Sequence, residues 1–239
     1  MTKLDGKTAL ITGGTKGIGY GIAEAMIHKG MKVAITGRSK TTVDEAVKML
    51  NELKAGHCIG IESDVRSFES QEKAVAAVLE EWGQLDVLIA NAGVGHFANI
   101  GDLTVEQWNE TIDINLTGVF YSVKSSLAAL KASKGYIITI ASLAGTNFFA
   151  KGSAYNASKF GLVGFTQALM LDVRQDDIKV STVMPGSVST YFNNRVPSEK
   201  EAWKIQSEDI GQIVVDLLQM PARTLPSKVE VRPSKPPTK

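Results

Sequence analysis

The sequence predicts a single α/β domain built on a doubly wound parallel sheet of about seven strands, with helices on both faces. Short apolar runs alternate along the chain with longer amphipathic stretches of helical period. The runs at 87–90 and 136–140 are apolar at nearly every position, which is typical of parallel strands buried on both faces. Ligands bind such sheets at the carboxyl ends of the strands, so we expect functional residues directly after strands.

Each predicted element follows from one of these two patterns. We expect strands at 8–12, 32–36, 57–63, 86–90, 135–141, 179–184 and 228–232, and helices at 17–29, 41–55, 67–82, about 104–131, about 153–175 and 207–219. A chain of 239 residues with 44% hydrophobic content can form one core but not two, so one domain is expected over 1–231. The remaining segment, 232–239, is rich in proline and charge and is expected to be a flexible tail.

The composition excludes several classes of function. Because the net charge is only +1 and no long block of either sign occurs, we expect a small-molecule partner, with no nucleic-acid or membrane surface. No apolar run reaches the length of a membrane span, and residues 1–6 lack the apolar core of a signal peptide, so we expect a cytoplasmic protein. Cys58, the single cysteine, is interpreted as a core residue. No spacing of histidine, cysteine and carboxylates predicts a metal site.

The segment 12–19, Thr-Gly-Gly-Thr-Lys-Gly-Ile-Gly, connects the first predicted strand to the first helix. Its glycines remove side chains where the chain bends, and they let a ligand approach the N–H groups at the helix start. Such a pattern alone is weak, because glycine also marks ordinary turns, but the flanking strand and helix favour a nucleotide-phosphate site. The cofactor-binding residues predicted here are Gly13, Thr15, Gly17 and Gly19.

The end of the second strand predicts which dinucleotide binds. An acidic residue at this place holds the ribose of NAD, whereas a basic residue accommodates the 2′-phosphate of NADP. The chain has Arg38 followed by Ser39 and no carboxylate, and Lys16 in the glycine turn can approach the same phosphate. We therefore predict NADP(H), the alternative being that both cations are solvated surface charges.

Polar or small residues also follow the third and fourth strands. Asp64 and the Val65 N–H are expected at the adenine edge, and Asn91 begins the Asn-Ala-Gly segment in which Ala92 and Gly93 leave room for the cofactor backbone. Each residue alone is a weak signal, since any turn needs such residues. Their common position at the binding edge of the sheet is what supports the interpretation.

Chemistry is predicted between residues 115 and 159. Tyr155 and Lys159 are four residues apart in a helical pattern, so they lie on one face, and Ser142 directly follows the fifth strand. Lowering the pKa of a phenol from about 10 by three units requires roughly 4 kcal/mol, and a positive charge at about 4 Å supplies that at an effective dielectric constant of 20. We therefore expect Lys159 to lower the pKa of Tyr155. The alternative is an ordinary surface helix that carries a tyrosine and a lysine.

With TGGTKGIG at 12–19, NAG at 91–93, Asn115, Ser142, YNASK at 155–159 and Pro185-Gly186 in this order, the chain resembles the short-chain dehydrogenases/reductases, which have a Rossmann fold. The resemblance covers about residues 5–220. It implies an NADP(H)-dependent oxidoreductase that transfers a hydride between nicotinamide and a carbonyl or secondary alcohol.

The resemblance also implies roles for single residues. Tyr155 is implied to be the general acid in reduction and the base in oxidation, Ser142 to orient the substrate oxygen, and Lys159 to hold the nicotinamide ribose and lower the tyrosine pKa. Asn115 is similar to the family residue that holds a water linking the lysine to a proton relay. The Ile18 N–H is implied to meet the pyrophosphate. The nicotinamide side is implied to be bound by Pro185, Gly186, Val188 and Thr190.

Departures from the family pattern bear on substrate and assembly. Ala90 stands where many relatives have asparagine, and the substrate lid, residues 189–207, looks shorter than in fatty-acid-type ketoreductases. The charged proline tail replaces a glycine-rich end, so we expect either a homodimer formed by the two long helices or a homotetramer.

Residues after strands four, five and six are expected to line the substrate pocket. Because most are apolar, they favour a hydrophobic or aromatic ketone or aldehyde, with a 3-oxoacyl thioester also open. The same aromatic side chains could instead pack under a lid or contact a second subunit. A non-catalytic NADP-binding sensor or scaffold is the alternative function. The predicted substrate-binding residues are His96, Leu143, Phe148, Phe149 and Tyr191, with Val94, Phe97, Thr146, Asn147 and Phe192 in the same loops.

Overall fold

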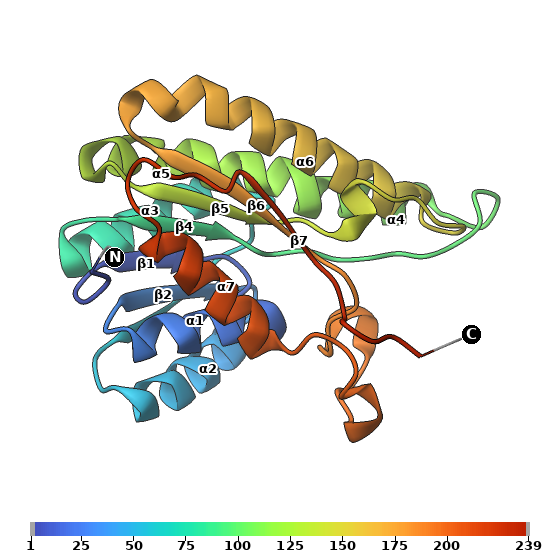
Figure 1. Cartoon of the computed structure of the whole chain (residues 1–239), viewed down its shortest axis with the longest axis horizontal. Coiled ribbons are helices and arrows are strands. Elements are labelled where there is room, and N and C mark those ends of the chain that lie inside the picture. The colour runs from blue at the N-terminus through green and yellow to red at the C-terminus, as the bar shows by residue number, and fades with distance from the viewer. Residues whose placement is uncertain (1–2, 238–239) are drawn as a thin grey trace.

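The computed structural model describes residues 3–237 and contains a seven-stranded sheet in which every neighbouring pair is parallel (Figure 1). The strand order is β3-β2-β1-β4-β5-β6-β7. The strands are β1 Thr8–Ile11, β2 Lys32–Gly37, β3 Cys58–Glu62, β4 Val87–Ala90, β5 Tyr136–Ile140, β6 Lys179–Pro185 and β7 Lys228–Val231. The predicted doubly wound sheet is confirmed, and each predicted strand agrees with the structure to within one residue at either end.

Helices cover both faces of the sheet. On one face lie α1 Gly17–His28, α2 Lys40–Leu53 and α7 Ser207–Gln219; on the other lie α3 Phe68–Trp82, α5 Gly118–Ser133 and α6 Ser153–Val173, with α4 Val105–Ile112 leading into α5 (Figure 1). This arrangement leaves the ends of the strands open to loops. The sheet order reverses between β1 and β4, and in doubly wound folds such a reversal creates the crevice where ligands bind.

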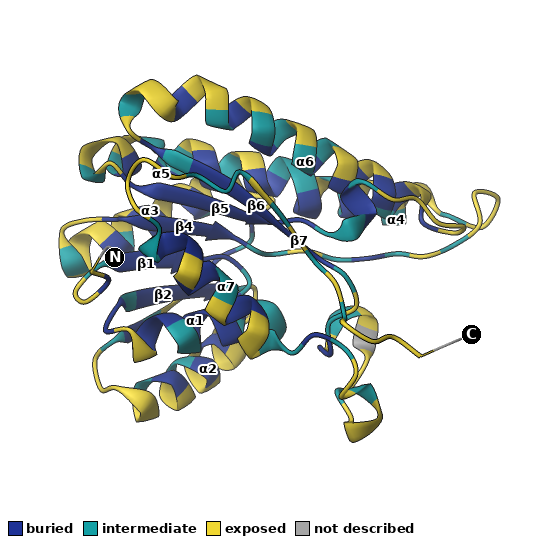
Figure 2. Ribbon diagram, viewed as in Figure 1, coloured by how far each residue is buried: buried dark blue, intermediate teal, exposed yellow. Residues whose placement is uncertain are grey.

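The core consists of two layers because successive strand residues point to opposite faces. In β1, Ala9 and Ile11 pack with α1 and α7, whereas Leu10 packs with the layer that contains α5 and α6. All three are almost completely buried, and Figure 2 shows the central strands buried throughout. Burial on both sides explains why the strands are continuously apolar in the sequence.

The long predicted helix at 104–131 is not a regular α-helix. A π-helical segment, Asp113–Thr117, separates α4 from α5, so the prediction of one continuous helical stretch is corrected at this point. A π-turn accommodates one extra residue per turn and occurs frequently at functional sites. Asn115 lies within it and is fully buried.

Some expectations concern residues at the ends of the chain. The predicted domain, 1–231, begins with Met1 and Thr2, and the predicted tail, 232–239, ends with Thr238 and Lys239. These four residues lie outside the described residues. Within residues 3–237, no helix is both long and apolar enough to cross a bilayer. The same part of the chain contains no group of three or more potential metal ligands.

Candidate active site

The glycine turn between β1 and α1 forms an anion cradle. Gly13 has a φ of +65°, and a Cβ at this position would lie 3.0 Å from the Cα of Ala92, so glycine is required there. Among the described residues, Lys16 at the start of α1 gives the helix no side-chain cap, and the first turn contains no acidic side chain. The N–H groups of that turn are therefore available to a phosphate.

Beside this turn lies a cavity of about 410 Å³ between the β1–α1 turn and the start of α2. Two cations, Lys16 and Arg38, line it, and Arg38 is 59% exposed. Two positive charges, Arg38 after β2 and Lys16 at the start of α1, fit a phosphate group better than a ribose hydroxyl. The lining residues are Thr15, Lys16, Arg38, Ser39, Thr42, Glu45, Ala46 and Met49.

Side chains that follow β3 and β4 form hydrogen bonds at this edge of the sheet. The amide of Asn91 donates to the carbonyl oxygens of Thr12 and Gly13, both at 2.9 Å, so its side chain fixes the glycine turn. Both carboxylate oxygens of Asp64 accept from Arg66, with a shortest distance of 2.6 Å. The hydrogen bond from Arg66 holds the pKa of Asp64 below its usual range.

Ser142 and Tyr155 meet where the loop after β5 faces α6. Ser142 lies two residues after the end of β5 and caps the short 3-10 turn Leu143–Gly145 through the Ala144 N–H. Burial raises the pKa of the Tyr155 phenol, and a hydrogen bond with Ser142 partly offsets that increase. The structure thus brings together a serine and a tyrosine that are 13 residues apart in the sequence.

Lys159 lies one turn after Tyr155 on α6, as the sequence predicted. Its side chain is buried, the Nζ donates to the Ile140 carbonyl oxygen at 3.0 Å, and it lies 5.8 Å from the centroid of the Tyr155 ring. Burial lowers the pKa of Lys159 from 10.5 to about 8. Removal from water is thus the largest effect on both groups, and the expectation that Lys159 lowers the pKa of Tyr155 stays a prediction.

Asn115 connects three parts of the site. Its Oδ1 accepts from the Val94 N–H and its Nδ2 donates to the Val94 carbonyl, both at 2.8 Å. The same Nδ2 donates to the Ser158 hydroxyl on α6 at 3.0 Å. A Cβ placed on Gly93 would lie 3.3 Å from the Asn115 Oδ1 and 3.7 Å from the Lys159 Nζ, so the loop after β4 passes close to both side chains.

Four aromatic rings from three loops and α6 form a cluster around the candidate catalytic tyrosine. We call Phe97, Phe149, Tyr155 and Phe192 the aromatic cluster. The Phe97 ring lies 5.4 Å from that of Tyr155 in an edge arrangement, and the Phe192 ring lies 5.8 Å from it. These separations are within the range of stabilising aromatic pairs.

The other predicted substrate residues occupy different surroundings. Phe148 is 87% exposed, and Tyr191 lies under the Lys16 ammonium at 5.8 Å, on the side of the glycine turn. His96 donates from Nε2 to the Glu110 carboxylate at 2.7 Å. Leu143 lies beside Gly186, with its Cδ1 3.1 Å from the position of a Cβ there.

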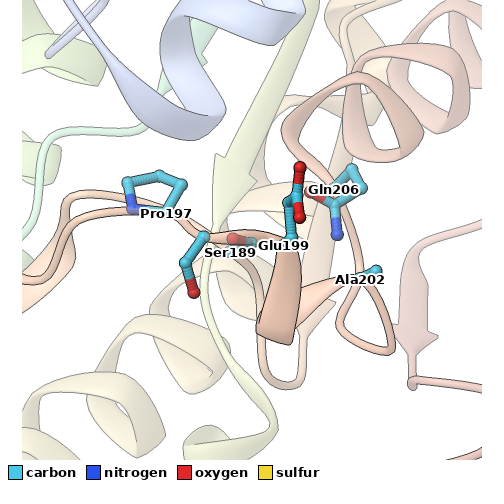
Figure 3. Close-up of a pocket in the computed structure, with 6 residues that line it drawn as sticks. Ser189, Pro197, Glu199, Ala202 and Gln206 are labelled. Carbon is cyan, nitrogen blue, oxygen red and sulfur yellow. The ribbon is translucent and has the colours of Figure 1, made fainter.

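The segment after β6 contains residues 189–207, which the family resemblance predicts to be a lid. Val188 forms a parallel bridge with Ile205, and the Ser189 hydroxyl donates to Glu201 at 2.9 Å, while Glu201 also pairs with Lys204. A cavity of about 490 Å³ opens within the lid (Figure 3). It is lined by Ser189, Pro197, Ser198, Glu199, Ala202 and Gln206, and, among the described residues, none of the four predicted catalytic side chains contributes to it.

Several predicted cofactor residues lie between the lid and the glycine turn. A Cβ on Gly17 would be 3.5 Å from Thr190, which brings the segment after β6 next to the start of α1. The Gly186 N–H donates to the Val231 carbonyl at 2.8 Å, so the Pro185-Gly186 pair is held by the end of β7.

Comparison with known proteins assigns the chain to a family. The family model described as short chain dehydrogenase matches residues 7–201. The chain belongs to the short-chain dehydrogenase/reductase family. An uncharacterized oxidoreductase of Staphylococcus saprophyticus is 32% identical, with 98% of this chain and 100% of the relative covered. A putative ketoacyl reductase of Streptomyces coelicolor is 34% identical, with 96% and 89% covered.

A solved structure resembles this short-chain dehydrogenase/reductase along nearly its whole length. It is the alcohol dehydrogenase of the archaeon Thermococcus sibiricus complexed with 5-hydroxy-NADP, with a TM-score of 0.91, 27% identity, and coverage of 98% of this chain and 100% of that one. The family and the fold together establish an oxidoreductase that uses a nicotinamide cofactor.

Sequence reasoning missed one charged residue at this site. Glu110 on α4 lies between His96 and Arg38, with its Oε1 3.9 Å from the Arg38 Nη1. In the sequence it is one of several carboxylates in an amphipathic helix, and such residues usually face solvent. No local motif distinguishes it, because its partners belong to distant segments.

Proposed function

We propose that this short-chain dehydrogenase/reductase uses NADP(H) to interconvert a hydrophobic or aromatic ketone or aldehyde and the corresponding alcohol. The observation that carries the proposal is the Tyr155 phenol, hydrogen-bonded to Ser142, with the buried Lys159 one helical turn away. A phenol in this setting can give a proton to a carbonyl oxygen, and a positioned acid of this kind contributes about 10²–10⁴-fold to a rate.

The residues divide the work as follows. The cofactor, when bound, supplies or accepts the hydride. Tyr155 donates the proton to the substrate oxygen in reduction, and Ser142 donates a hydrogen bond that orients the same oxygen. Lys159 would bind the cofactor ribose and would pass a proton toward Tyr155, with Asn115 as a second member of this proton relay.

The preference for NADP(H) is supported by the cavity that contains Lys16 and Arg38. The glycine turn and the first turn of α1 would hold the diphosphate, and Asp64 with Val65 would border the adenine. The Thermococcus sibiricus relative was solved with an NADP derivative, which agrees with this assignment.

The aromatic cluster supports the substrate class. Ring faces and edges beside Tyr155 favour a flat, apolar substrate whose carbonyl reaches the phenol. A 3-oxoacyl thioester is the second candidate, and it is favoured by the 34% identity to the putative ketoacyl reductase of Streptomyces coelicolor.

The decisive experiment compares carbonyl reduction by the parent enzyme and by Tyr155→Phe. Loss of NADPH absorbance is followed with aryl ketones, aryl aldehydes, quinones and a 3-oxoacyl thioester. We expect Tyr155→Phe to bind NADPH like the parent and to lose about 10²–10⁴-fold in kcat. Undiminished turnover by this variant would refute the assigned role. A parent that binds NADPH but reduces no carbonyl would instead support the non-catalytic sensor.

The cofactor assignment has its own test. Arg38→Ala removes one charge-assisted contact to the 2′-phosphate, which contributes about 1.5 kcal/mol after solvent screening. We therefore expect the KM for NADPH to rise about tenfold and the KM for NADH to change little. Equal changes for both cofactors would remove the assignment.

A further inference from the structure

Glu110 links the cofactor edge of the site to the loop between β4 and α4, residues 91–104, which we call the substrate loop. Its Oε2 accepts from the His96 Nε2 at 2.7 Å, whereas its Oε1 lies 3.9 Å from the Arg38 Nη1. All three side chains are partly accessible: Arg38 is 59% exposed, Glu110 34% and His96 30%. One carboxylate thus has a close partner in the substrate loop and a loose partner at the end of β2.

Glu110 can pair with Arg38, whereas the neighbouring carboxylate Asp64 is already bound to another arginine. Asp64 is occupied by Arg66 through both oxygens. The pKa of Arg66 is raised mainly by Asp64, and to a smaller extent by the charges of Glu110 and Asp113. The Arg38 guanidinium, which lines the cavity assigned to the 2′-phosphate, therefore has an anionic neighbour before any cofactor binds.

We propose that Glu110 is a specificity-determining residue that competes with the 2′-phosphate of NADP(H) for Arg38, and that His96 limits this competition by holding the carboxylate. The inference rests on the proposed use of NADP(H). A carboxylate paired with Arg38 must be displaced before the guanidinium can contact the phosphate with its full set of donors. Glu110 therefore weakens binding of the phosphorylated cofactor relative to NADH.

Glu110 also has a structural role through its contact with His96. His96 immediately precedes Phe97, whose ring packs against Tyr155 at 5.4 Å. By binding His96, Glu110 fixes the loop that brings Phe97 to the catalytic tyrosine. The same side chain thus positions the substrate loop and reduces the affinity for the cofactor phosphate.

The test uses the full chain and two cofactor fragments without nicotinamide, adenosine 2′,5′-bisphosphate and AMP, with affinities measured by calorimetry. Glu110→Gln removes the charge but keeps an oxygen that can accept from His96. We expect this variant to bind the bisphosphate about two- to five-fold more tightly, which is the range of an exposed ion pair, and AMP unchanged. Glu106→Gln, one turn earlier on α4, is the matched control and should change neither affinity.

His96→Ala supplies a second variant with the opposite sign. Without the imidazole, Glu110 is free to move closer to the Arg38 guanidinium, 3.9 Å away, so bisphosphate affinity should fall about twofold. In the Glu110→Gln background the same His96→Ala change should have no effect on it, because the competing charge is already gone. A residue that only maintained the fold would give changes of one sign, and these would add.

The outcomes separate this inference from the proposed function. If the parent binds the bisphosphate no more tightly than AMP, the assignment of NADP(H) fails. If the parent prefers the bisphosphate but Glu110→Gln leaves that preference unchanged or lowers it, the role of Glu110 is refuted while the cofactor assignment stands.

Discussion

Replacing Lys159 with methionine should stabilise the protein without cofactor at neutral pH. Burial lowers the pKa of this lysine from 10.5 to about 8, so keeping it charged costs the folded state about 3 kcal/mol at pH 7. Methionine fills a similar volume and has no charge to desolvate. It loses the hydrogen bond to the Ile140 carbonyl, worth about 1 kcal/mol. The net expectation is about 2 kcal/mol of stabilisation, or roughly 4–8 °C in Tm for a chain of this size.

The pH dependence gives the prediction its sign. Between pH 8 and 10.5 the unfolded chain binds the Lys159 proton more tightly than the folded chain does, so the parent gains stability as the pH rises. Below pH 8 the cost is fully present, and above 10.5 it is gone. The advantage of Lys159→Met should therefore be constant at low pH, decrease through this window, and become a loss of about 1 kcal/mol when only the hydrogen bond is missing.

Denaturant unfolding of both proteins from pH 6 to 10.5, without cofactor, measures this difference. Other titrating groups contribute equally to parent and variant and cancel in the comparison. Lys48→Met, at an exposed position of α2, is the control and should show no such window. A Lys159→Met protein that is less stable at pH 7, or a difference that does not vary with pH, would refute the reasoning. The variant should also lose carbonyl reduction, which would show that a charge costly to the fold is kept for its function.

Three further predictions follow from single contacts. Ser142→Ala removes the hydrogen bond that lowers the pKa of Tyr155, so the pH profile of alcohol oxidation should shift to higher pH along with a lower kcat; an unshifted profile would contradict the contact. Asn91→Ala removes two hydrogen bonds to the glycine turn and should lower the free energy of unfolding by about 1–3 kcal/mol and weaken NADPH binding, measured by denaturation and fluorescence titration. Burial raises the pKa of the Cys58 thiol to about 12, so a thiol reagent should modify the folded protein at pH 8 only at the rate of unfolding; rapid labelling would contradict its burial.

Most of the fold could be predicted because its elements are repeated and strongly patterned. Strands buried on both faces, such as Val87–Ala90, are continuously apolar, and helices such as Ser207–Gln219 show one apolar face. The rule that ligands bind after parallel strands then predicts that Arg38, Ser142 and the glycine turn lie at one edge of the sheet. The same logic could not predict the π-helical segment, because one extra residue in one turn barely changes a helical pattern.

The pKa values of Tyr155 and Lys159 were harder to predict from their spacing in the sequence than their positions were. The four-residue separation of Tyr155 and Lys159 correctly placed both groups on one helix face. It gave no information about how far each group is removed from water. Desolvation of each group depends on segments as distant as Ile140 and the loop that carries Phe97. The sequence therefore predicted the effect of the charge on Lys159 but not that burial raises the pKa of the phenol and lowers that of the ammonium.

The π-helical segment explains how two side chains of the α4–α5 region form hydrogen bonds to the same loop, the one after β4. Asn115 bonds both backbone groups of Val94, and Glu110 bonds His96 two residues later in that loop. In a regular α-helix, residues five apart lie about 140° from each other around the axis and would face different surroundings. Widening the turn at Asp113–Thr117 reduces that rotation, so both side chains reach the loop after β4. The same π-helical turn thereby positions the Asn115 amide and the Glu110 carboxylate, and it connects the position of Phe97 beside Tyr155 to the backbone of α4 and α5.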